Sequence, residues 1–128
     1  MIEGIESIYQ NLADAITSSV PVAWSSARSE ATFFSDNIEF SGEYVPVSGS
    51  PRSFKVSREI MKAFDELRRK FKEAGQPLWG QVTFELTAEG KFNLKWVYDN
   101  CDANGDTIWD EQEWHCRKEE RRIRLSQP

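Results

Sequence analysis

The sequence is poor in the residues from which most active sites and disulfide frameworks are built. It contains one histidine, His115, and two cysteines, Cys101 and Cys116. Two cysteines are too few for a disulfide framework and lack the partner spacing of a zinc site, so we expect reduced thiols, no metal and no cofactor. A disulfide, or an approach of Cys101 to His115 through folding, stays open. His115 and Cys116 are adjacent and would point apart on a helix, which argues against a nucleophilic pair and against an enzyme.

Long apolar runs are also absent from the sequence, and its first residues lack the pattern expected of a secretory leader. No run approaches the roughly 18 apolar residues that span a bilayer. The first ten residues carry Glu3 and Glu6, where a signal peptide would be basic and then apolar. Five Trp, eight Phe and three Tyr supply bulky core material for a chain of 128 residues. We therefore expect one cytoplasmic domain over residues 1–128 that does not enter a membrane.

The clearest pattern lies between residues 54 and 99 and begins as a helix. The apolar residues that recur at helical spacing are Val56, Ile60, Ala63, Phe64, Leu67 and Phe71. Ser57 is placed to cap the first turn of this helix. Gly75 can adopt the left-handed conformation that ends a helix, and Pro77 prevents its resumption. This segment is a scaffold and carries no catalytic group.

After Pro77 the apolar period changes from helical spacing to two, which indicates a β-hairpin. Val82, Phe84 and Leu86 are predicted to share one face of a strand. Residues 88–91 form the turn, and residues 92–98 continue the apolar face in the return strand. Trp79 and Trp96 fall on or beside these apolar faces, so we expect both in the core.

The remaining segments complete an α+β domain in the order α-β-β-α-β-β, with a final helix expected at 110–125. Apolar residues from Ile2 to Val20 recur at helical spacing, and Pro21 ends that helix. The elements expected next are a strand at 22–34 containing the core residue Trp24, a turn at 35–37, a strand at 37–47 and a loop at 48–53. The simplest packing is an antiparallel sheet with the helices on one face.

A resemblance to the YezG-type family of bacterial immunity proteins is carried by the stretches IYQNLADAITSSVPVAWSSARSEATFF and FKVSREIMKAFDELRRKFKEAGQPLWGQVTFELTAEGKFNLKWVYD. The matching features are Pro21 with Trp24, Gly75 with Trp79, and the aromatic strand at 91–99. The resemblance implies an antitoxin that neutralises the C-terminal nuclease domain of a contact-dependent growth inhibition or related polymorphic toxin. It implies stoichiometric blocking, with an EndoU-like RNase as the toxin. Residues after Cys101 fit the family poorly, so a partner-specific surface is expected there.

Charge is arranged in blocks within a net charge of −5. Residues 1–50 carry seven acidic residues against one basic residue, and residues 76–116 carry eight against two. Such a surface repels nucleic acid and attracts a basic protein, although solubility is a competing explanation for any single cluster. The residues expected to bind the partner are Asp99, Asp102, Asp106, Trp109, Asp110, Glu111 and Glu113, followed by Asp36, Glu39 and Glu43. Trp109 is an interface anchor or a packing residue, and packing is favoured for Trp114.

The segment from Asp102 to Glu113 also resembles an EF-hand calcium loop. Its oxygen-bearing residues fall at loop positions one, three, five, nine and twelve: Asp102, Asn104, Asp106, Asp110 and Glu113. Thr107 stands where the loop needs glycine, and the preceding residues alternate like a strand where an EF-hand has a helix. A calcium-binding or other interaction module is thus the alternative function. The competing structural explanation is a polar turn before the final helix.

Overall fold

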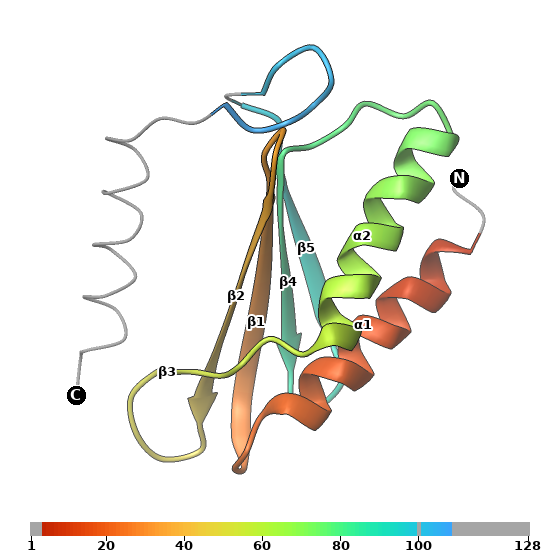
Figure 1. Cartoon of the computed structure of the whole chain (residues 1–128). Helices are drawn as coiled ribbons and strands as arrows, with labels where there is room; N and C mark the ends of the chain where they lie inside the picture. Colours follow the sequence, from red (N-terminus) through yellow and green to blue (C-terminus); the bar gives the residue numbers. More distant parts are fainter. Residues whose placement is uncertain (1–3, 100, 109–128) are drawn as a thin grey trace.

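The computed structural model describes residues 4–99 and 101–108, and its elements follow the predicted order (Figure 1). The helices are α1 (Ile5–Ser19) and α2 (Arg58–Glu73), which lie on one side of the sheet. The strands are β1 (Trp24–Phe33), β2 (Ile38–Pro46), β3 (Arg52–Ser53), β4 (Gln81–Thr87) and β5 (Phe92–Val97). They form one antiparallel sheet in the order β3-β2-β1-β4-β5. The predicted α+β class is confirmed, and the helix expected at 110–125 lies outside the described residues.

Local signals set the limits of α2 as the sequence predicts. The hydroxyl of Ser57 accepts a hydrogen bond from the amide of Ile60 at 3.3 Å, which satisfies one free donor of the first turn. At the other end Gly75 has a φ of 67°, and its amide donates to the carbonyl of Lys72. Neither α1 nor α2 has the length and apolar character needed to cross a membrane.

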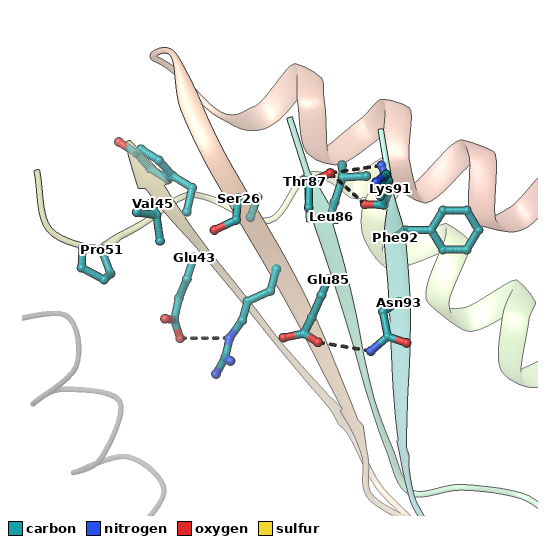
Figure 2. A pocket seen from close by; sticks show the side chains of 13 residues that line it. Ser26, Glu43, Val45, Pro51, Glu85, Leu86, Thr87, Lys91, Phe92 and Asn93 are labelled. Atoms are coloured by element: carbon teal, nitrogen blue, oxygen red, sulfur yellow. Dashed lines mark hydrogen bonds and ion pairs between the residues drawn. The ribbon is translucent and has the colours of Figure 1, made fainter. Parts of the chain in front are cut away.

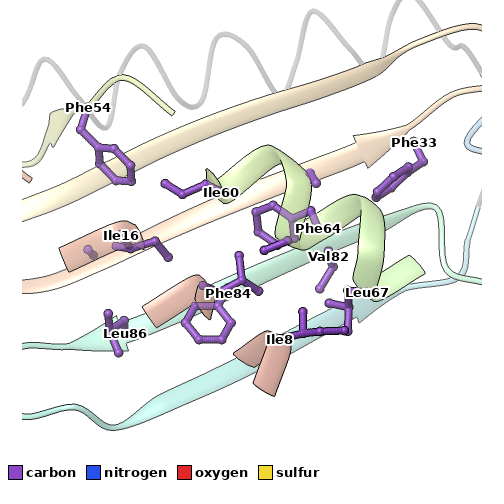
Figure 3. Packing of buried hydrophobic residues seen from close by; sticks show 14 of the residues in the cluster. Ile8, Ile16, Phe33, Phe54, Ile60, Phe64, Leu67, Val82, Phe84 and Leu86 are labelled. Atoms are coloured by element: carbon purple, nitrogen blue, oxygen red, sulfur yellow. The ribbon is translucent and has the colours of Figure 1, made fainter. Parts of the chain in front are cut away.

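The core lies between the two helices and one face of the sheet (Figure 3). Val82, Phe84 and Leu86 of β4 point into it and are at most 3% exposed, so the face predicted for the core is confirmed. Phe64 and Leu67 of α2 cover them and are fully buried. Each fully buried side chain of this size contributes about 2 kcal/mol to folding. The helix pair and sheet therefore form a closely packed support for the loops at the sheet's ends.

An aromatic cluster closes the core at one end of the sheet. Trp79 is fully buried, and its ring lies 5.5 Å from that of Phe33 and 5.7 Å from that of Phe71, both in edge-to-face contact. Trp96 lies 5.1 Å from Trp79 on the β5 side. The prediction that these two tryptophans and Trp24 pack in or against the core is confirmed.

One element was not predicted from the sequence. The segment 48–53 was expected to be a loop, but its last two residues form β3, which pairs with β2 through Ser53 opposite Glu43 and Arg52 opposite Tyr44. A two-residue strand leaves no periodic pattern, so its pairing depends on where the preceding hairpin places the chain. The strand widens the sheet at the edge beyond β2.

Candidate functional site

The loop after β5 returns to the end of the sheet where β1 passes into β2. The amide of Thr107 donates to the carbonyl of Phe33 at 2.7 Å, and Thr107 forms a parallel bridge with Phe34. Figure 1 shows this loop over the same end of the sheet as the β1–β2 turn. Two segments far apart in the sequence, the turn containing Asp36 and the loop 101–107, therefore lie side by side.

This arrangement gathers several of the acidic residues predicted to bind a partner. We call the group the acidic end, and its members are the exposed residues Asp36, Glu39, Asp99 and Asp102. Exposed apolar side chains occur at the same end of the sheet: Ile38 is 36% exposed, Tyr98 50% and Ile108 54%. Apolar anchors within a charged surround are the usual composition of a protein interface. The structure thus places negative charge and exposed apolar side chains at one end of the sheet.

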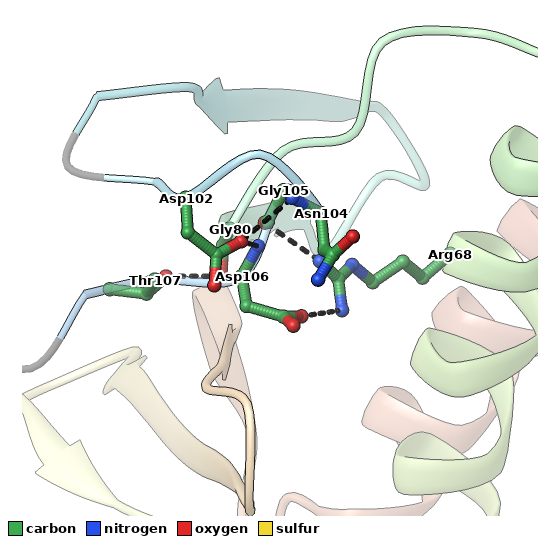
Figure 4. A network of polar contacts seen from close by, with 7 residues as sticks. All are labelled: Arg68, Gly80, Asp102, Asn104, Gly105, Asp106 and Thr107. Atoms are coloured by element: carbon green, nitrogen blue, oxygen red, sulfur yellow. Dashed lines mark hydrogen bonds and ion pairs between the residues drawn. The ribbon is translucent and has the colours of Figure 1, made fainter.

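Hydrogen bonds within the loop fix the shape of residues 102–106 (Figure 4). The amide of Asp102 donates to the carbonyl of Asp106 at 2.8 Å. One carboxylate oxygen of Asp102 accepts from the amides of Asn104 at 2.9 Å and Asp106 at 3.1 Å. Gly105 completes the turn with a φ of 80°, and Leu78 packs where a side chain at this position would stand. Asp102 therefore shapes the loop and still presents an exposed carboxylate.

Gly80 anchors the loop to the sheet. Its carbonyl accepts from the amide of Phe33 at 2.7 Å and from the hydroxyl of Thr107 at 3.0 Å, while its amide donates to Val97 at 2.9 Å. A side chain on Gly80 would collide with that hydroxyl and with the sulfur of Cys101. Burial raises the pKa of the free Cys101 thiol above its ordinary value. The backbone of this one residue thus joins the loop to the central strands.

Asp106 is bound to α2. Its carboxylate accepts from Arg68 at 2.8 Å, and the same guanidinium donates to the carbonyl of Gly105 at 2.7 Å (Figure 4). The guanidinium carbon of Arg68 also lies 4.6 Å from the centre of the Phe33 ring. The side chains of Arg68 and Asp106 are only 15% and 20% exposed. Removing one partner of a partly buried pair of this kind costs about 2 kcal/mol, between the values for exposed and buried pairs.

Glu43, the third acid predicted in the first hairpin, lies apart from the acidic end. It is 7% exposed and faces Arg28 across the β1–β2 pair, with 4.0 Å between a carboxylate oxygen and Nε. Four residues of strand, about 13 Å, separate it from Glu39. Glu43 lines a hollow of about 470 Å³ together with Arg28 and Glu85 (Figure 2). The structure therefore joins Asp36 and Glu39 to the later acidic block but does not join Glu43 to them.

The described part of the EF-hand-like loop is engaged in protein contacts. Asp106 is paired with Arg68, and the strand β5 stands near the position of the helix that precedes an EF-hand loop. Within residues 4–99 and 101–108 no three His, Cys, Asp or Glu side chains are grouped to hold a metal ion. The predicted binding residues Trp109, Asp110, Glu111 and Glu113 lie outside the described residues, as do Trp114, His115 and Cys116.

The fold defines a class, an α+β domain with a helix-backed antiparallel sheet and an acidic end. The chain belongs to the YezG-like immunity protein family, whose model matches residues 5–120. It is 24% identical over 113 residues to the Immunity protein YezG of Bacillus spizizenii, an alignment that covers 76% of this chain and 70% of that protein. It is 25% identical over 112 residues to the Type VII secretion system protein EsaG of Staphylococcus aureus, covering 75% and 69% respectively. The family expected from the sequence is thus confirmed.

Proposed function

We propose that this chain is an antitoxin that binds the C-terminal nuclease domain of a toxin and blocks it by occupancy, without chemistry of its own. Membership of the YezG-like immunity protein family supports the antitoxin role. The acidic end supports the choice of partner, because a nuclease is basic where it holds its substrate and is drawn to negative charge. The observation that carries this proposal is the approach of Thr107 to Phe34, which brings Asp36 to the loop with Asp102.

The family resemblance supports a finer proposal for the identity of the toxin. We propose an EndoU-like RNase, delivered by a contact-dependent growth inhibition or related polymorphic toxin system and met by this chain in the cytoplasm. The Staphylococcus relative is named as a type VII secretion system protein, and export of the toxin by such a system is consistent with this route. Asp36, Glu39, Asp99 and Asp102 form the proposed interface, with Trp109, Asp110, Glu111 and Glu113 extending it.

The test is to look for a toxin gene beside this chain's gene and to produce the nuclease domain it encodes with and without the chain. Co-expression should restore growth, and the two proteins should purify together. Titration of the chain into an RNA-cleavage assay should stop cleavage at an equimolar amount, because blocking by occupancy consumes one inhibitor for each toxin. Inhibition far below equivalence would indicate turnover and contradict the proposal, as would cells that die despite co-expression.

A further inference from the structure

We propose that Arg68 is a positioning residue for toxin binding, which holds the loop 101–107 in the orientation against α2 that the partner meets. The inference rests on the proposed function and assigns a role to a basic residue on a helix outside the acidic end. Arg68 would act through the loop, since its guanidinium is directed to Asp106 and Gly105.

The geometry joins three parts of the molecule through one guanidinium. Arg68 extends from α2, lies against the ring of Phe33 on β1, and reaches a side chain and a backbone carbonyl of the loop. A planar guanidinium can donate in two directions at once, whereas a lysine ammonium lacks this fork. The contacts with Asp106 and Gly105 therefore fix the orientation of the loop as well as its distance from the helix.

The tip of the loop depends on this contact more than its base does. Thr107 is held by Phe33 and Gly80 through bonds that do not involve Arg68. The residues between Asp102 and Asp106 are attached to α2 through the guanidinium. Without it, the tip would sample more conformations, and the toxin would have to order them on binding, which lowers affinity.

A neighbouring residue supplies a matched control. Arg69 follows Arg68 on α2, but its side chain is 61% exposed and pairs with Asp65 of the same helix at 2.7 Å. Arg68→Met and Arg69→Met each remove one positive charge from the same helix. They differ in that only the first change releases the tip of the loop from α2.

The experiment measures two quantities on the full chain at a temperature where each variant is folded. Hydrogen exchange at the amides of Asn104 and Asp106 reports the loop, and binding to the catalytically inactivated toxin domain reports its consequence. We expect Arg68→Met to accelerate exchange at these amides and to weaken binding about tenfold, mainly through faster dissociation. Arg69→Met should leave both quantities within about twofold of the original chain.

Equal affinities of the two variants would overturn the inference, as would weaker binding by Arg68→Met with unchanged exchange at the loop. If the unaltered chain does not bind the toxin, the proposed function and this inference both fail. If the unaltered chain and Arg69→Met bind while Arg68→Met binds equally well, only the inference fails.

If Arg68→Met does not fold, Asp106→Asn tests the same contact from the other side. It removes the negative charge of Asp106 and preserves the volume of the side chain. It should accelerate loop exchange and weaken binding in the same direction. The double variant should lose no more affinity than Arg68→Met alone, because both changes break one contact. Additive losses would contradict the proposed pathway through Asp106.

Discussion

Thr107 lies beside Phe34 in a parallel bridge, and its amide donates to Phe33 at 2.7 Å. This contact joins the end of β1 to a loop that follows the last described strand. As a result, an acidic turn from the first half of the chain and an acidic loop from the second half form one surface.

Charge reversal at Asp36 should weaken toxin binding. Asp36 lies in the β1–β2 turn at the acidic end and is exposed, so its substitution by lysine removes attraction without disturbing the core. We expect about a tenfold loss of affinity, mostly in the association rate, and a smaller dependence on salt concentration. Association kinetics at two or more salt concentrations measure both effects.

The matched control is Glu89→Lys. Glu89 is an exposed acid in the β4–β5 turn at the opposite end of the sheet, and its reversal changes the net charge by the same amount. If Asp36→Lys and Glu89→Lys weakened binding equally, overall charge would explain the effect and the acidic end would lose its special role.

Calcium should not bind the loop after β5. The carboxylate of Asp106 already forms an ion pair with the Arg68 guanidinium at 2.8 Å. A calcium ion bound by that carboxylate would have to displace the guanidinium. Titration with millimolar calcium should leave tryptophan fluorescence and the melting temperature unchanged, with magnesium at equal ionic strength as the control. A saturable signal specific to calcium would restore the alternative of a calcium-binding module.

Gly80→Ala should destabilise the protein. The added methyl group would meet the hydroxyl of Thr107 and the sulfur of Cys101, so the loop or the sheet end must shift. We expect a loss of about 1–3 kcal/mol in the free energy of unfolding, the usual cost of overpacking. Urea denaturation measures it, and Gln76→Ala, an exposed change in the same α2–β4 connection, should stay within about 0.5 kcal/mol. Equal stabilities would show that the loop does not depend on close approach to Gly80.

Cys101 should react slowly with thiol reagents in the folded protein. Burial raises its pKa, so less thiolate is present near neutral pH than for a free cysteine. The same shift has a defined sign for stability. As pH rises above the ordinary thiol pKa of 9.0, the unfolded chain loses this proton first, and the Cys101 contribution to stability falls.

Alkylation rates of a Cys116→Ser variant against pH measure this pKa, because Cys101 is then the only thiol. The midpoint should lie above that of the same variant in urea. A midpoint at or below the value in urea would contradict the partial burial of the Cys101 side chain.

Periodicity made most of the fold predictable. The alternation of Val82, Phe84 and Leu86 marked β4 and its buried face, and Ser57 and Gly75 marked the limits of α2, because each acts through neighbours in sequence. The short strand β3 was missed because its pairing with β2 is decided by tertiary position. Local patterns therefore gave the elements and left the edge of the sheet undetermined.

The candidate site was less predictable because its contacts cross long stretches of sequence. Arg68 looked like one more basic residue on a polar helix face, yet its partner Asp106 lies 38 residues away. Glu43 looked equivalent to Asp36 and Glu39, but strand length carries it to another part of the sheet. A list of acids in the sequence does not say which acids are exposed or which already have a cation beside them.

The double role of the Gly80 carbonyl has an evolutionary consequence. The same oxygen accepts a hydrogen bond from Phe33 at the end of β1 and another from Thr107 in the loop. The attachment of the loop therefore does not involve its exposed acidic side chains. Outward-facing positions such as Asp99 can then be exchanged during divergence without refolding the scaffold. If the surface of the proposed toxin partner changes, a few exposed substitutions could thus restore binding while the fold stays the same.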